Sequence, residues 1–170
     1  MMSKAELRAK YRPSKHTVID TYDLRKIIKG RKIGFYYPVF SEVDVKKAMK
    51  ELISFYDVYL PFTDLDGMEY RRVESFGKYD KDYYKINSGT GETININDLD
   101  TILVPAIAYN TKGYRLGYGK GYYDKALAGY NGNIIGICND NSFIEEEFQE
   151  KHDLKANYVI TNKGLKRLKE

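Results

Sequence analysis

One stretch of the chain combines glycines at alternate positions with charged side chains, a pattern that could bind phosphate. It runs Arg115-Leu-Gly-Tyr-Gly-Lys-Gly-Tyr-Tyr-Asp124 and is called the glycine loop below. Its glycines permit left-handed backbone and a close approach to a ligand, so that successive N–H groups can converge on anionic oxygens. Arg115 and Lys120 could add positive charge, and Asp124 could bind a divalent metal that is also coordinated by the phosphates. The stretch therefore predicts a phosphate or nucleotide site.

The segments beside the glycine loop support this interpretation. The preceding run, residues 99–109, is apolar and typical of a buried strand. Residues 122–127 predict the opening of a helix, whose first N–H groups favour an anion. No Gly-Lys-Ser/Thr of a P-loop is present, and Tyr122 stands where a dinucleotide fingerprint has its third glycine. On these grounds alone, a glycine-rich turn whose charges have no role is the alternative.

The glycine loop resembles the signature of the 5-formyltetrahydrofolate cyclo-ligase family, also called methenyltetrahydrofolate synthetases. Members convert 5-formyltetrahydrofolate to 5,10-methenyltetrahydrofolate with ATP and Mg²⁺, through a phosphorylated formyl group, and release ADP and phosphate. The resemblance implies the same activity here, with catalytic roles for Lys120, Arg115 and Tyr122 and the metal at Asp124. It also implies ATP contacts along the loop, at Arg115, Leu116, Gly117, Tyr118, Gly119, Lys120, Gly121, Tyr122 and Tyr123.

The N-terminus predicts a short helix that carries two further ATP contacts. Ser3 is an N-cap candidate, and Glu6 completes a capping box. Lys4 and Arg8 belong to a Lys-x-x-Leu-Arg element that the family uses at the ATP phosphates, so the resemblance implies this role for both. A solvated helix face is the alternative. The region before the first strand is shorter than in the family, because only residues 21–29 look helical.

The folate side is expected after the first strand. Residues 32–39 predict that strand, and residues 43–54 an amphipathic helix. Glu42 lies between the predicted strand and the predicted helix, at the edge where open α/β sheets bind ligands. The resemblance implies that Glu42 contacts the pterin and that Tyr37 lines the same pocket. The alternative for Glu42 is charge stabilisation of the helix N-terminus, and Tyr37 alone would be an ordinary core aromatic.

A predicted β-hairpin adds two more substrate contacts. Strands are expected at residues 57–62 and 68–73, joined by a turn at residues 64–67. Met68 and Tyr70 match a step that borders the folate site in relatives. At period two both side chains face the same side, so a shared core face is the alternative. The tyrosines within residues 79–84 are interpreted as cover over the core, with aromatic lining of a pocket as the alternative.

The C-terminal third predicts two strands, at residues 133–138 and 156–161, with a short acidic helix at residues 143–149 between them. Asp153 is a candidate near the metal. The family's common second aspartate is Asn157 here, which argues against a two-aspartate metal site.

Composition predicts a single domain, residues 1–170, with 42% hydrophobic residues. The lone cysteine, Cys138, lies in an apolar run and is expected to be a buried structural thiol in a reducing cytoplasm. No run has membrane-spanning length, so a cytoplasmic protein without membrane association is expected. The net charge of +4 favours small anionic ligands without requiring nucleic acid.

Strands alternating with helices predict an α/β fold: a three-layer single domain with a mainly parallel central sheet and helices on both faces. The expected ligands are 5-formyltetrahydrofolate and ATP, with Mg²⁺, in a monomer or weak homodimer. Two alternatives remain. One is a non-catalytic nucleotide- or folate-binding module. The other is a nucleic-acid binder, since 17 tyrosines with a basic balance could stack bases. No basic stripe supports the second alternative.

Overall fold

The apolar runs of the chain form a mostly parallel sheet in the computed structural model, which describes residues 1–12, 16–39 and 41–170. The described helices are α1 (Lys4–Tyr11), α2 (Thr21–Arg25), α3 (Lys46–Leu52) and α4 (Tyr122–Ala126), with 3-10 turns η1 (Ile96–Asp98) and η2 (Asp140–Ser142). The described strands are β1 (Lys32–Gly34), β2 (Asp57–Thr63), β3 (Met68–Arg72), β4 (Asp80–Lys81), β5 (Asn87–Ser88), β6 (Thr93–Ile94), β7 (Thr101–Pro105), β8 (Ala108–Asn110), β9 (Arg115–Leu116), β10 (Asn133–Ile137), β11 (Phe143–Ile144), β12 (Tyr158–Thr161) and β13 (Gly164–Lys166).

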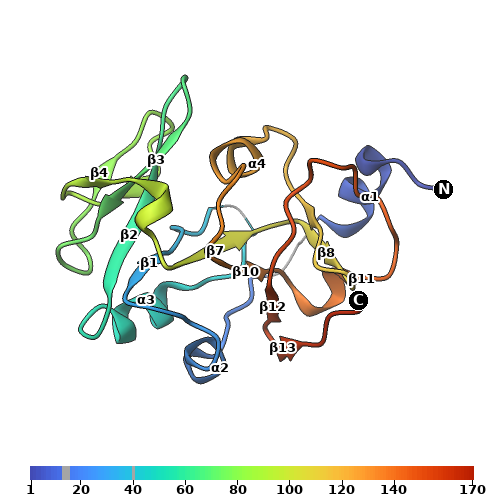
Figure 1. Cartoon of the computed structure of the whole chain (residues 1–170), viewed down its shortest axis with the longest axis horizontal. Helices are drawn as coiled ribbons and strands as arrows, with labels where there is room; N and C mark the ends of the chain where they lie inside the picture. Colours follow the sequence, from blue (N-terminus) through green and yellow to red (C-terminus); the bar gives the residue numbers. More distant parts are fainter. Residues whose placement is uncertain (13–15, 40) are drawn as a thin grey trace.

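In the described part of the chain, eight strands make the main sheet in the order β13-β12-β10-β7-β1-β2-β3-β6. The five inner strands, from β12 to β2, are parallel to their neighbours, and the outer pairs are antiparallel. From β1 the chain builds the sheet outward to β2, and from β7 it builds in the other direction through β10 and β12 (Figure 1). The strand order therefore reverses between β1 and β7, which is where an open α/β sheet offers a ligand-binding crevice.

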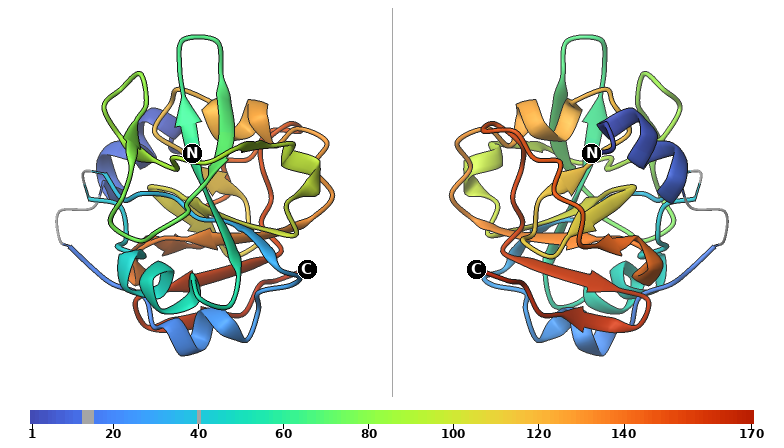
Figure 2. Two further views of the ribbon diagram at one scale, coloured as in Figure 1. Left: turned by 90° about the vertical axis from the view of Figure 1, so that its left-hand side faces the viewer. Right: turned by 90° about the vertical axis from the view of Figure 1, so that its right-hand side faces the viewer.

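Alternate residues of the inner strands enter two separate hydrophobic clusters. On β7, Leu103 packs with α2 and α3, whereas Ile102 and Val104 pack in a second cluster with Leu127, the residue that ends α4. Figure 2 shows α2 and α3 close together in the lower part of both views. A third, smaller cluster joins Leu7 of α1 to Leu116 and to the small sheet β11-β8-β9. This cluster fixes α1 beside the glycine loop.

The predicted elements are found with several corrections. The capping box of α1 is confirmed, with Ser3 and Glu6 bonded reciprocally. The predicted first strand was too long, since only residues 32–34 pair and the chain then turns toward the ligand edge. The run before the glycine loop is two strands rather than one, because β8 leaves the main sheet to pair with β9 and β11.

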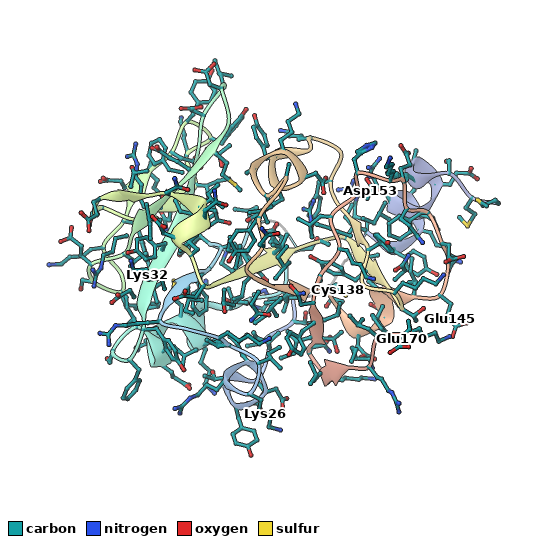
Figure 3. The ribbon with its side chains drawn as sticks, viewed as in Figure 1. Lys26, Lys32, Cys138, Glu145, Asp153 and Glu170 are labelled. Atoms are coloured by element: carbon teal, nitrogen blue, oxygen red, sulfur yellow. The ribbon has the colours of Figure 1, made fainter. Side chains whose placement is uncertain are left out.

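The predicted acidic helix over residues 143–149 is wrong. Phe143 and Ile144 form β11, which is parallel to β8, and the rest of the segment is extended or irregular. Tertiary contacts explain the difference, because Glu146 accepts hydrogen bonds from Tyr11 and Lys10 of α1, and Glu147 pairs with Lys112. These partners lie far away in the sequence. Cys138, which is labelled in Figure 3, is buried, as expected. Burial raises the pKa of its thiol to about 12.

Candidate active site

Two cavities lie at the carboxyl edge of the sheet, around the reversal between β1 and β7. The larger, of about 690 Å³, is lined mainly by aromatic and apolar side chains from β2, β3, the segment after β1 and the glycine loop. The smaller, of about 90 Å³, is lined by charged side chains and loop glycines. Arg115 and Gly121 line both cavities, so the two spaces meet at the glycine loop.

Arg115 is held in place on three sides. Its Nε donates a hydrogen bond to the carbonyl of Pro105 at the end of β7, at 2.9 Å. Its Nη1 lies 3.6 Å from Oδ2 of Asp124, and its guanidinium lies 5.0 Å from the ring centre of Tyr123. The side chain is 5% exposed. A guanidinium oriented in this way is a ready partner for phosphate oxygens.

Successive residues of the glycine loop line the two cavities alternately. Gly117 and Gly119 line the small cavity, whereas Tyr118 and Lys120 line the large one. Gly119 and Gly121 have φ values of +101° and +72°, the left-handed backbone expected of a phosphate loop. At Gly117 the requirement is steric, because a Cβ atom there would lie 2.4 Å from Nη1 of Arg115. Lys120 does not line the small cavity, and its Nζ lies 5.3 Å from the ring centre of Tyr84.

α1 reaches the glycine loop despite the short N-terminal region. Nε of Arg8 donates a hydrogen bond to the carbonyl of Gly117 at 2.8 Å, and Nζ of Lys4 lies 2.7 Å from Oδ2 of Asp153. Figure 3 shows Asp153 beside α1. Burial alone would raise the pKa of Asp153, but the hydrogen bonds from Lys4 and the Glu150 N–H lower it overall. Lys4 and Arg8 both line the small cavity.

Asp124 is one of the residues that line the small cavity. Its Oδ1 is buried and has no hydrogen-bond partner among the described residues. Asp153 lines the same cavity, whereas Asn157 lines neither and accepts a hydrogen bond from the Ile134 N–H at the opposite end of the sheet. In the part of the chain that the structure describes, no three His, Cys, Asp or Glu side chains form a metal cluster. A metal here would complete its coordination with ligand oxygens and water, as Mg²⁺ commonly does.

Glu42 lies in the wall of the large cavity, in the segment that follows β1. Its Oε1 accepts a hydrogen bond from the Val39 N–H at 2.9 Å. Burial raises the pKa of this carboxyl to about 7, and the Val39 N–H and Arg115 limit the rise. Glu42 is therefore poised to accept hydrogen bonds when ionised and to hold a proton when it is not.

The other expected substrate residues divide into two groups. Tyr37 and Met68 line the large cavity, as do Tyr122 and Tyr123 of the loop. Tyr70 lines neither cavity, because its side chain is fully buried in the second core cluster and packs beside Gly34. The position of Tyr70 therefore agrees with the alternative stated for it above, a side chain on the core face of the strand.

A wall of the large cavity comes from a segment that sequence reasoning interpreted as cover over the core. Asp82 accepts hydrogen bonds from the N–H groups of Thr63, Tyr84 and Ile86, which fixes the β4–β5 hairpin onto β2. Tyr84 then reaches across to hydrogen-bond with the hydroxyl of Tyr122. Arg12 and Tyr36 also line this cavity and were missed. The run of tyrosines in residues 79–84 was the available signal.

The fold and these two cavities define an α/β protein in which a small charged cavity lies beside an aromatic-lined pocket at one sheet edge. Comparison with known proteins identifies the family. A family model described as the 5-formyltetrahydrofolate cyclo-ligase family matches residues 4–162. The chain belongs to this family, whose members are ATP-dependent ligases acting on folate in one-carbon metabolism.

Curated relatives and solved structures agree with this membership. A 5-formyltetrahydrofolate cyclo-ligase of Mycolicibacterium smegmatis is 39% identical over 70 residues, which cover 40% of this chain and 36% of that protein. One from Mycoplasma genitalium is 27% identical over 127 residues, or 74% of each chain. The NMR structure of Aquifex aeolicus 5,10-methenyltetrahydrofolate synthetase superimposes with a TM-score of 0.83 at 27% identity, covering 99% of this chain and 94% of that one.

Proposed function

We propose that this chain catalyses the ATP-dependent cyclisation of 5-formyltetrahydrofolate to 5,10-methenyltetrahydrofolate, with release of ADP and phosphate. The observation that carries the proposal is the meeting of the two cavities at Arg115 and Gly121. An apolar, aromatic-lined space suits the pterin, and a small charged space with left-handed glycines suits phosphates. The family membership supplies the two substrates.

Folate recognition falls to the large cavity. Glu42 would anchor donor groups of the pterin, while Tyr37, Met68, Tyr122 and Tyr123 form walls around it. Tyr70 would act by packing beneath this surface, because it does not reach the cavity.

ATP recognition falls to the small cavity. The glycine loop would present backbone N–H groups to the phosphates, from residue 116 to residue 123, and Arg115, Lys4 and Arg8 would add charge. Lys120 is exposed at the large cavity, and we infer that it approaches the phosphate only when both ligands are bound. Its catalytic role, like that of Tyr122, is part of the proposal.

Mg²⁺ fits the small cavity through Asp124. The buried Oδ1 of this carboxylate has no other partner among the described residues, and hard oxygen donors are what Mg²⁺ prefers. When bound, the ion would neutralise charge on the phosphates during phosphoryl transfer.

The chemistry then needs little beyond positioning. The formyl oxygen attacks the γ-phosphorus, the bond from that phosphorus to the bridging oxygen breaks, and ADP leaves. N10 next bonds to the activated formyl carbon and releases its proton, and the carbon–oxygen bond breaks to free phosphate. Arg115 lies where both ligands meet and would stabilise the charge transferred between them.

ADP release tests the proposal. With Mg-ATP present, we expect ADP to form only when 5-formyltetrahydrofolate is added, at one ADP per methenyl product. Binding of both ligands without ADP formation would instead support a non-catalytic folate- and nucleotide-binding module. ADP formation at the same rate with and without the folate would contradict both hypotheses.

Three further properties are part of the proposal. We expect a monomer or weak homodimer, a three-layer arrangement with helices on both sheet faces, and a cytoplasmic location. Among the described residues, no helix combines the length and apolar character needed to cross a bilayer.

A further inference from the structure

Tyr109 lies on β8, directly opposite Arg115 on β9 in the antiparallel pairing of the small sheet. Side chains of directly opposed residues lie on the same face of a sheet, with their Cβ atoms about 4.5–5.5 Å apart. The ring of Tyr109 is fully buried in the second core cluster and lines neither cavity. Tyr109 is therefore a buried neighbour of the arginine that lines both cavities.

Both side chains are bonded to the carboxyl end of β7. The Tyr109 hydroxyl donates a hydrogen bond to the carbonyl of Val104 at 2.8 Å, and Nε of Arg115 donates to the carbonyl of the next residue, Pro105, at 2.9 Å. Burial raises the pKa of the Tyr109 hydroxyl, and the positive charge of Arg115 limits the rise. The hydroxyl therefore stays protonated and keeps its hydrogen for the Val104 carbonyl.

The ring of Tyr109 also packs tightly against the main sheet. Gly136 of β10 lies opposite Val104 of β7, and a Cβ atom at Gly136 would lie 2.5 Å from Cζ of Tyr109. On the other side of the pair, a Cβ atom at Gly117 would lie 2.4 Å from Nη1 of Arg115. Glycines at these two positions thus leave the space that the tyrosine and the arginine occupy. Side chains packed this closely transmit a displacement to their neighbours.

We propose that Tyr109 is a positioning residue for Arg115, whose hydrogen bond to β7 and packing against Gly136 hold the guanidinium where the two cavities meet. The inference rests on the proposed function and deepens it, because it adds a residue that acts on the reaction only through Arg115. Without its hydroxyl, the ring is no longer bonded to β7, and the guanidinium gains freedom to leave the place where phosphoryl charge develops.

A test that needs no ligand is Tyr109→Phe, which keeps the ring and removes only the hydroxyl. NMR of nitrogen-15-labelled protein would follow the exchange of the Arg115 Nε proton with water, its signal being identified by its absence from Arg115→Lys. We expect slow exchange in the wild type and clearly faster exchange in Tyr109→Phe, because local opening controls the rate.

Tyr130→Phe is the matched control. Its hydroxyl also donates to a backbone carbonyl, that of Leu99, which precedes β7 at the opposite end of the strand. Tyr130 packs against the same core cluster and lines neither cavity. Its substitution should leave the exchange of the Arg115 Nε proton and the kinetics unchanged.

Turnover kinetics give a second readout. We expect Tyr109→Phe to lower kcat/KM for ATP roughly threefold to tenfold, the effect of one lost hydrogen bond. In the Arg115→Lys background the same substitution should cause no further loss, because Tyr109 acts through the guanidinium. A merely structural role would instead give losses that multiply in the double variant.

Unchanged exchange of the Arg115 Nε proton in Tyr109→Phe, equal acceleration in Tyr130→Phe, or multiplying losses in the double variant would overturn the proposal. If the wild-type protein does not turn over, the proposed function fails, while the NMR comparison still decides whether Tyr109 positions Arg115.

Discussion

Arg115 depends on the absence of a side chain two residues later. A Cβ atom at position 117 would lie 2.4 Å from its Nη1 and 2.9 Å from its Cζ. The guanidinium cannot move aside without cost, since its Nε is bonded to the Pro105 carbonyl at the end of β7. Gly117 is therefore required by the position of a charge, whereas Gly119 and Gly121 are required by their own backbone.

We therefore expect Gly117→Ala to displace the Arg115 guanidinium and lower kcat/KM for ATP about tenfold or more, consistent with losing a charge-assisted hydrogen bond of about 1.5–3 kcal/mol. Steady-state kinetics with ATP varied would measure it. A thermal unfolding curve close to that of the wild type would show that the fold persists. Normal ATP kinetics in the folded variant would mean that Arg115 does not need its present position.

The raised pKa of Glu42 predicts that the free energy of unfolding depends on pH. Its carboxyl pKa is raised from 4.5 to about 7 by burial, so the folded state holds the proton more tightly than the unfolded state does. The stability that this group contributes is therefore greatest at low pH and is lost as the pH rises from about 4.5 through 7.

Glu42→Gln should remove this dependence. Between pH 5 and pH 8 we expect the wild-type free energy of unfolding to fall by about 2 kcal/mol more than that of the variant, from the size of the pKa shift. Urea unfolding at the two pH values measures the difference. Parallel pH profiles for the two proteins would show that Glu42 ionises normally in the folded state.

At the scale of elements, α1 connects the core to the small cavity. Leu7, on one side of this helix, is 1% exposed in the cluster with Leu116 and Ile107. Arg8, the next residue, donates to the Gly117 carbonyl. The burial of one residue thus fixes the position of the other.

Leu7→Ala should cost about 2–5 kcal/mol of stability, as buried leucine truncations do, and should also raise the KM for ATP. The KM for folate should change less, because Lys4 and Arg8 line only the small cavity. Urea unfolding and kinetics at a temperature where the variant is folded would measure the two effects. Ala9→Ser, at an exposed position of the same helix, is the control. Equal changes in both KM values would contradict the separate role of α1.

The β4–β5 hairpin is the corresponding element on the folate side. The Asp82 carboxylate accepts from three N–H groups, including one on β2, and thereby positions Tyr84 at the large cavity. We expect Asp82→Ala to raise the KM for 5-formyltetrahydrofolate several-fold and to destabilise the protein by about 1–3 kcal/mol, through unpaired backbone donors. The exposed Asp80, two residues earlier, provides the control variant Asp80→Ala. Folate kinetics that respond equally to the two variants would exclude this role for the hairpin.

At the scale of the whole molecule, the sequence predicted the parts whose signals are local. Apolar runs predicted the inner strands, the capping box predicted α1, and the glycine pattern predicted the left-handed backbone at positions 119 and 121. What it missed depends on partners distant in sequence. Phe143 and Ile144 pair with β8 although the segment looks helical. Tyr84 reaches the cavity because the Asp82 carboxylate accepts a hydrogen bond from the Thr63 N–H of β2. Such contacts leave no periodic pattern to recognise.

The topology also explains why the site lies where it does. β1 and β7 are neighbours from which the chain builds the sheet in opposite directions, so their carboxyl ends leave a crevice between them. Glu42 follows β1, and Arg115 is bonded to the last residue of β7. The two cavities therefore meet at Arg115 and Gly121, in the crevice outside the carboxyl ends of β1 and β7.

The most direct measurement is the absorbance of the methenyl product when the purified protein meets 5-formyltetrahydrofolate, with and without Mg-ATP. Our account predicts that absorbance grows only when both substrates are present, because the cyclisation needs the formyl oxygen to be phosphorylated first. No growth in the presence of both substrates, from a folded protein that binds each of them, would contradict the proposal that the two cavities form one catalytic site.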